Sequence, residues 1–154
     1  MTEATTKLLT AIDELTTAFM AMAADPAHPM SAVKGFGVYG DVSDVRLPAL
    51  DIWPGALTRE GQRAHADIFF KITAPVHGSY AGALRQVYVI ERAVWRVLET
   101  KLPAAAASAL AGGKFEYRGL VEPPKPIERK SGEKVEMLLT ASAAATWHFL
   151  EHHD

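Results

Sequence analysis

Two short segments of the 154-residue sequence match motifs that bind nucleotides or metal ions. Residues 35–40, Gly-Phe-Gly-Val-Tyr-Gly, have the spacing G-x-G-x-x-G of a dinucleotide-binding turn. That turn holds a pyrophosphate only where it follows a core strand and begins a helix, because the phosphates meet the N-terminus of the helix. Here only residues 31–33 precede the motif, and a polar turn and a proline-bearing strand follow it. We therefore interpret the segment as a glycine-rich strand or bulge that another backbone approaches closely.

The second match is at residues 148–152, which are His-Phe-Leu-Glu-His. In zinc peptidases with the spacing H-x-x-E-H, two histidines one helical turn apart bind the metal and the glutamate acts as base. A third ligand is still needed and comes from farther along the chain, but only His153 and Asp154 follow here. We therefore expect no catalytic zinc site, and at most adventitious binding of a divalent ion by His148, His152 and His153.

The other reactive side chains form no recognisable catalytic set. The sequence has no cysteine, which excludes disulfides, thiolate metal ligands and cysteine nucleophiles. No serine stands in the G-x-S-x-G turn of a hydrolase nucleophile, and no phosphate-binding P-loop occurs. Two carboxylate pairs, Asp41 with Asp44 and Glu133 with Glu136, have surroundings typical of a solvated surface. The sequence therefore predicts a protein that is not an enzyme and uses no cofactor.

Length and composition are those of one globular domain over residues 1–154. Hydrophobic residues make up 49% and charged residues 22%, so the chain can bury a core of its own. The net charge of −2 predicts neither specific nucleic-acid recognition nor attraction to an anionic membrane. No apolar stretch reaches the roughly 20 residues of a membrane span, and the N-terminus lacks a signal-peptide layout. The protein is expected to stay where it is made or to join an assembly there.

A helix and three strands are predicted in the first half of the chain. Apolar residues recur every three or four positions over residues 5–23, which predicts an amphipathic helix. Residues 32–42 form a weakly alternating, glycine-rich strand, and residues 47–53 form a second strand closed by a turn at Pro54-Gly55. Strict alternation over residues 64–73 predicts the third strand. Its buried face comprises Ala64, Ala66, Ile68, Phe70 and Ile72.

A second helix and two further strands complete the predicted domain. The helix covers residues 79–101, and its apolar stripe is assigned to Leu84, Val87, Tyr88, Trp95 and Leu98. Strands near residues 115–119 and 135–141 follow, joined by a long solvated loop over the proline-rich residues 123–132. The expected fold is α+β, in the order α-β-β-β-α-β-β. It has a mainly antiparallel sheet of four to five strands, with two helices packed on one face.

Several details of this succession point to one family. Leu-Pro-Ala at residues 47–49 begins a strand, Ala74-Pro75 breaks the alternating strand, and an amphipathic helix starts at Ser79. Phe-Glu-Tyr-Arg at residues 115–118, a variable loop and an alternating last strand follow. The pattern resembles the tail terminator (tail-completion) proteins of long-tailed bacteriophages and related phage-tail-like particles. The resemblance covers nearly the whole chain. It is a resemblance in the order and patterning of strands and helices, because that family has no invariant chemical motif.

The resemblance implies a structural virion protein with a binding function. Such a protein caps the completed tail tube as a homo-oligomeric ring of six copies, stops tube polymerisation and offers a surface for head–tail joining. Its partners would be the tail tube protein and a head-side connector or neck protein. It would lie at the head-proximal end of the tail in the virion, after assembly in the host cytoplasm. The alternatives are another neck or tail-tube component, or a small-ligand-binding or enzymatic α+β domain.

Outward-facing residues are the candidates for contacts between copies or with the tube. Phe69 is apolar on the otherwise polar face of the alternating strand, although single exposed apolar residues are also normal. The tryptophans are expected to anchor a core or an interface rather than a ligand. The candidate interface residues are Trp53, Phe69, Lys71, Lys125, Arg129 and Lys130.

Overall fold

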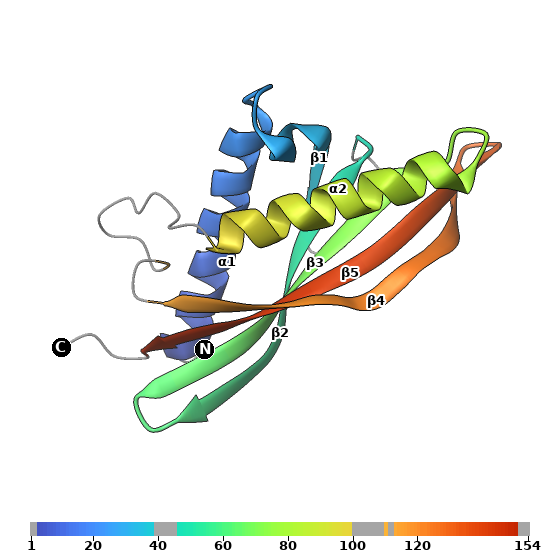
Figure 1. Ribbon diagram of the computed structural model, residues 1–154. Helices are drawn as coiled ribbons and strands as arrows, with labels where there is room; N and C mark the ends of the chain where they lie inside the picture. Colours follow the sequence, from blue (N-terminus) through green and yellow to red (C-terminus); the bar gives the residue numbers. More distant parts are fainter. Residues whose placement is uncertain (1–2, 39–45, 100–109, 111–112, 151–154) are drawn as a thin grey trace.

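The computed structural model describes residues 3–38, 46–99, 110 and 113–150 (Figure 1). In chain order the elements are α1 (Glu3–Ala23), the 3-10 helix η1 (Pro29–Ala32), β1 (Gly35–Val38), β2 (Ala49–Glu60), β3 (Arg63–Pro75), α2 (Tyr80–Glu99), β4 (Lys114–Ser131) and β5 (Lys134–Leu150). Among the described residues, no helix is both long and apolar enough to cross a membrane.

The strands form one five-stranded sheet in the order β1-β2-β3-β5-β4. β1 runs parallel to β2, whereas all other neighbouring strands are antiparallel. The predicted α+β class and the order α-β-β-β-α-β-β are therefore confirmed. The sheet is strongly twisted, and β4 and β5 form a long ribbon that extends past both ends of α2 (Figure 1).

The alternating pattern of β3 does divide the sheet into two faces. The side chains predicted to be buried at positions 64, 66, 68, 70 and 72 are all at most 3% exposed. The adjacent strand β5 contributes alanines to the same face, at Ala141, Ala143 and Ala145. We call this the inner face of the sheet, and the opposite side the outer face.

Both helices cover the inner face. Phe70 of β3 meets Phe19 of α1 edge to face, with ring centroids 6.0 Å apart. Tyr117 of β4, also on the inner face, donates a hydrogen bond from its hydroxyl to Glu91 of α2. α1 lies behind the β4–β5 ribbon in Figure 1, and α2 crosses in front of β2 and β3.

The predicted turn at Pro54-Gly55 is wrong, because both residues lie inside β2. The pairing of β2 with β3 shifts register between Pro54 and Leu57, which marks a bulge in the strand. Gly55 leaves room for the ring of Phe69 on β3, since a Cβ there would lie 2.5 Å from its Cε2 atom. The chain turns instead at Gly61, whose φ of 64° suits a two-residue hairpin.

The predicted loop over residues 123–132 is also wrong. β4 continues to Ser131 and remains paired with β5 down to Ser131 opposite Lys134. The tight turn follows at Gly132, with φ of 63°. Prolines are tolerated in β4 because it is an edge strand, which pairs on one side only.

Candidate functional site

Helix α2 has two apolar sides, and the one that packs on the sheet consists mainly of alanine and β-branched residues. The buried residues are Ala83, Val87, Ile90, Ala93, Val94, Val97 and Leu98. These short side chains let the helix lie close to the alanine-rich inner face of β5. Of the stripe predicted from the sequence, only Val87 and Leu98 are buried.

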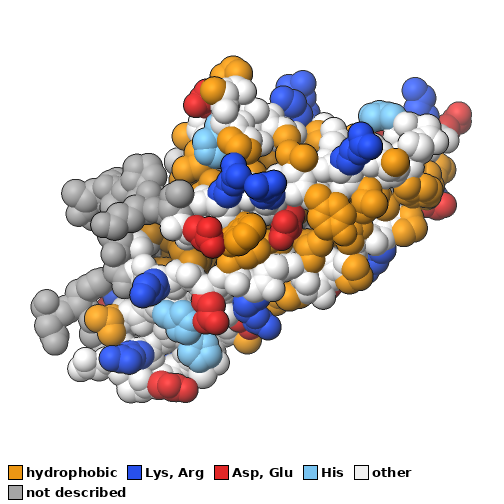
Figure 2. Space-filling view, in the orientation of Figure 1, with side chains coloured by type: hydrophobic (Ala, Val, Ile, Leu, Met, Phe, Trp, Pro, Cys, Tyr) orange, Lys and Arg blue, Asp and Glu red, His pale blue; other side chains and the backbone are white. Residues whose placement is uncertain are grey.

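The larger residues of that predicted stripe lie on the solvent side of α2. Leu84, Tyr88 and Trp95 are 38–49% exposed, and so is Tyr80, which the predicted stripe does not include. Their spacing places them in one row along the helix, on the side next to β4. Together with Pro124 and Pro126 of β4, they form what we call the aromatic strip. Figure 2 shows hydrophobic side chains gathered along α2 and β4.

A shallow depression lies within the aromatic strip. It has a volume of about 330 Å³ and is lined by Tyr80, Leu84, Pro124, Pro126 and Leu139. Small-molecule sites combine an apolar lining with a few convergent polar groups. Four of the five lining residues here are leucines or prolines, so the depression suits an apolar side chain from another protein better than a polar metabolite.

Trp95 is held in a defined position by its neighbours. Its ring stacks on Tyr117 with centroids 6.1 Å apart, and its indole Nε1 donates to Glu99 at 2.7 Å. The Tyr117 hydroxyl donates to Glu91 at 2.5 Å. Burial, and then the hydrogen bond and negative charge of Glu91, raise the pKa of Tyr117 well above its ordinary value. The phenol therefore stays protonated as a donor, and the aromatic group is ordered before any partner binds.

A row of arginines runs beside the aromatic strip on α2. Arg85, Arg92 and Arg96 are all exposed, and the spacings of seven and four residues place them on one side of the helix. Figure 2 shows basic side chains over α2, next to the hydrophobic band. Two carboxylates of the same helix, Glu91 and Glu99, accept hydrogen bonds from Tyr117 and Trp95 and would repel a phosphate backbone. The surface is therefore better suited to a protein partner with acidic groups than to nucleic acid.

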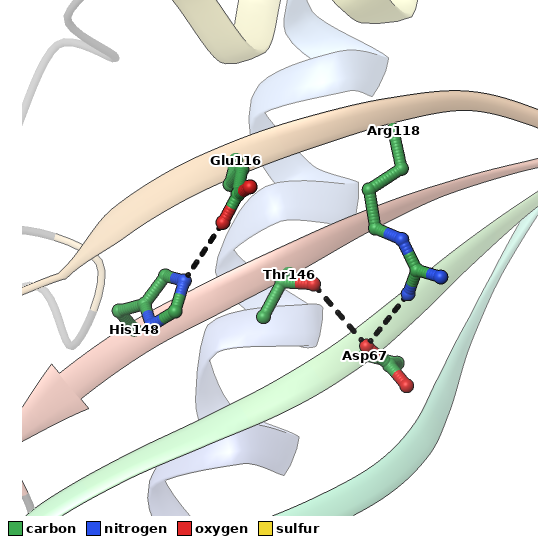
Figure 3. Close-up of polar contacts among 5 residues, drawn as sticks. All are labelled: Asp67, Glu116, Arg118, Thr146 and His148. Atoms are coloured by element: carbon green, nitrogen blue, oxygen red, sulfur yellow. Dashed lines mark hydrogen bonds and ion pairs between the residues drawn. The ribbon is translucent and has the colours of Figure 1, made fainter.

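The outer face of the sheet carries exposed polar pairs rather than a catalytic cluster (Figure 3). Asp67 of β3 accepts hydrogen bonds from Arg118 at 3.2 Å and from Thr146 at 3.3 Å. Glu116 of β4 lies 3.3 Å from the His148 ring nitrogen. The Arg118, Glu116 and His148 side chains are 47–71% exposed, so the network is a set of solvated cross-strand contacts.

His148 belongs to strand β5, so it does not lie on the helix that the zinc motif H-x-x-E-H requires. Its ring instead faces His65 on β3, with centroids 5.7 Å apart. Within the described part of the chain, no three His, Asp or Glu side chains are grouped to hold a metal ion. His152 and His153 lie outside the described residues, so the expected adventitious binding remains a prediction.

Three of the candidate interface residues predicted from the sequence come together on the outer face. Trp53 of β2 pairs with Phe69 of β3, and Lys71 lies two residues further along β3. All three are half-buried. The Phe69 ring covers Gly55 of the neighbouring strand, so this side chain is partly occupied within its own chain.

The other three predicted residues lie far from that group, toward the hairpin that joins β4 and β5. Lys125 and Lys130 are exposed on β4, opposite Thr140 and Val135 of β5. Arg129 makes an ion pair with Glu136, with a nitrogen–oxygen distance of 2.6 Å. The sequence-based prediction thus joined residues that the fold separates into two regions.

The aromatic strip was missed because the sequence of α2 contains two overlapping apolar stripes. Periodicity places Tyr88 and Trp95 on one stripe and Val87, Ile90 and Val94 on the other. Periodicity alone assigns the larger side chains to the core, whereas α2 packs on the alanine-rich face of β5 through its smaller side chains. One signal in the sequence could have identified the aromatic strip as exposed. The second stripe of α2 is rich in Ala and Val, which suit a close contact between helix and sheet.

No model of a known protein family matches this chain, and no curated protein sequence matches it.

Proposed function

We propose that the protein is a structural assembly component that forms a ring on the end of a tail tube, as the tail terminator proteins that its sequence pattern resembles do. In this role it would bind other copies of itself, the tube protein and a head-side neck or connector protein. The ring would end tube polymerisation and provide the joining surface in the virion. The function requires no substrate and no cofactor.

The aromatic strip is the observation that supports this proposal. Exposed aromatic residues, prolines and arginines next to a shallow apolar depression are typical of protein–protein contact surfaces. The fixed position of Trp95 between Tyr117 and Glu99 lowers the entropy lost when a partner binds. An apolar patch of this kind on a monomer normally marks an interaction site.

The oligomeric state and the effect on tube length test the proposal. Light scattering after size-exclusion chromatography, and negative-stain imaging with the tube protein of the same particle, should show rings and tubes of limited length. Trp95→Ala should weaken ring formation at least about tenfold, because aromatic hot spots carry about 2 kcal/mol or more. A chain that stays monomeric and leaves tube length unregulated would refute the proposal.

A ligand screen tests the alternative that the protein is a small-ligand-binding or enzymatic domain. Thermal denaturation with a panel of metabolites and divalent ions would reveal a small-molecule site as a rise in melting temperature. The proposed assembly role predicts that no compound raises the melting temperature, even at concentrations that would saturate a specific site. A rise that Leu84→Ala abolishes would instead place a ligand in the depression of the aromatic strip.

A further inference from the structure

The solvent side of α1 has a composition that is unusual for an exposed helix. One row of exposed positions, spaced three and four residues apart, runs along its length. We call it the α1 outer row; it consists of Glu3, Thr6, Thr10, Asp13, Thr17 and Met20. No basic residue belongs to it, and half of it is threonine, a poorer helix former than the Lys, Glu or Gln residues usual on solvent faces.

The threonines of this row present apolar groups to the outside. Thr10 and Thr17 donate their hydroxyls to the carbonyls of Thr6 and Asp13, at 2.9 and 3.0 Å. Their methyl groups remain available for contact. Lys7, the one basic residue of α1, donates to the Leu150 carbonyl at 2.8 Å and so leaves the row acidic. Between Glu3 and Met20 the row has only short side chains, which lose little conformational entropy when a partner buries them.

The α1 outer row complements the surface of α2 in charge and in length. Glu3 and Asp13 lie about 15 Å apart along the helix axis, and Arg85 and Arg96 lie about 16 Å apart on α2. The outer row is about 26 Å long, and the aromatic strip from Tyr80 to Trp95 is about 23 Å long. The two surfaces carry opposite charges at matching distances.

An antiparallel arrangement also matches the sizes of the facing side chains. Placing Asp13 beside Arg85 brings Glu3 near Arg96. The same register places the small Thr10 opposite Tyr88. At the other end, it places Met20, 52% exposed, about 2–3 Å before Tyr80 along the axis, within reach of a favourable thioether–aromatic contact. In a parallel arrangement Met20 would lie past the end of α2, opposite no residue of the strip.

We propose that the α1 outer row of one copy packs antiparallel on the aromatic strip and arginine row of the next copy. The two surfaces consist of different residues on different helices, so the contact joins unlike surfaces and is head-to-tail. Repeated around a closed circle, it builds a ring. This inference rests on the proposed function and adds to it the residues of the contact between copies.

Charge reversal at one predicted pair tests the contact. Asp13→Arg alone and Arg85→Asp alone should each weaken ring formation at least about tenfold, since each places like charges side by side. A 1:1 mixture of the two variants should form rings again, because every contact in an alternating ring then has opposite charges. The double variant in one chain should also recover association. Sedimentation velocity over a range of concentrations measures all four cases.

Matched controls separate this contact from a general effect of charge. Glu60→Arg and Arg63→Glu make similar changes at the β2–β3 turn, at residues that belong neither to the α1 outer row nor to the surface of α2, and should leave association unchanged. Circular dichroism melts establish that each exposed-site variant is folded. A surface of aromatic residues and arginines can also bind single-stranded nucleic acid, so binding of a fluorescent oligonucleotide is measured as well.

The possible results distinguish the inference from the proposed function. If the wild type forms rings and the single variants form them equally well, the α1–α2 contact is refuted while the ring remains. If the singles weaken association but the mixture fails to restore it, the predicted pairing is also refuted. If the wild type forms no ring with or without tube protein, the proposed function itself fails. Oligonucleotide binding that Arg85→Asp abolishes, with association unchanged, would assign the surface to nucleic acid.

Discussion

Ile90→Ala and Tyr88→Ala, two positions apart on α2, should have very different effects on stability. Ile90 is fully buried, whereas Tyr88 is 49% exposed. Truncation of Ile90 removes three carbons worth about 0.8 kcal/mol each, and the remaining cavity adds to the loss, so we expect about 2–5 kcal/mol. Tyr88→Ala should change the free energy of unfolding by no more than about 0.5 kcal/mol.

Urea denaturation followed by far-ultraviolet circular dichroism measures both variants against the wild type. Alanine stands at the mutated position in each case, so the gain in helix propensity is nearly matched. The melting temperature should fall by roughly 5–15 °C for Ile90→Ala and stay nearly constant for Tyr88→Ala. If Tyr88→Ala is the more destabilising variant, α2 is rotated relative to the structure described above, and the aromatic strip belongs to the core.

Two other features give predictions of stability. Because the pKa of Tyr117 is raised in the folded state, the free energy of unfolding should fall as pH rises above about 10. Urea denaturation between about pH 8 and 11 should show a smaller fall for Tyr117→Phe; equal falls would contradict this. Gly55→Ala should lower stability by about 1–3 kcal/mol through its clash with Phe69, whereas Gly82→Ala, with open space around it in α2, should raise stability by about 0.5–1 kcal/mol. A neutral Gly55→Ala in thermal melts would show that β2 can shift there.

The sequence predicts correctly those elements whose apolar residues can all be buried on one side in only one way. Strict alternation in β3 can place only one set of side chains in a core, and Phe70 and its neighbours are buried as expected. α1 is similar, because the residues from Leu8 to Phe19 form one apolar stripe. Local period and burial agree in both elements, so no tertiary information was needed.

The remaining features depend on which neighbour an element meets. The rotation of α2 follows from the alanines of β5, which only the pairing of strands brings beneath it. The continuation of β4 through its prolines depends on its place at the edge of the sheet. The pairing of Trp53 with Phe69 depends on Gly55 and the bulge beside it. These three features depend on contacts between residues far apart in the sequence, so a short segment of sequence cannot predict them.

The prolines of β4 have a consequence for how copies of the chain can aggregate. An exposed edge strand of 18 residues would ordinarily be a template for the stacking of chains into fibrils. Pro123, Pro124 and Pro126 lack backbone N–H groups, and three register shifts interrupt the regular pairing with β5. Open-ended strand addition is therefore interrupted in the middle of this edge. The same prolines thus make amyloid-like growth along β4 unfavourable when the chain is concentrated.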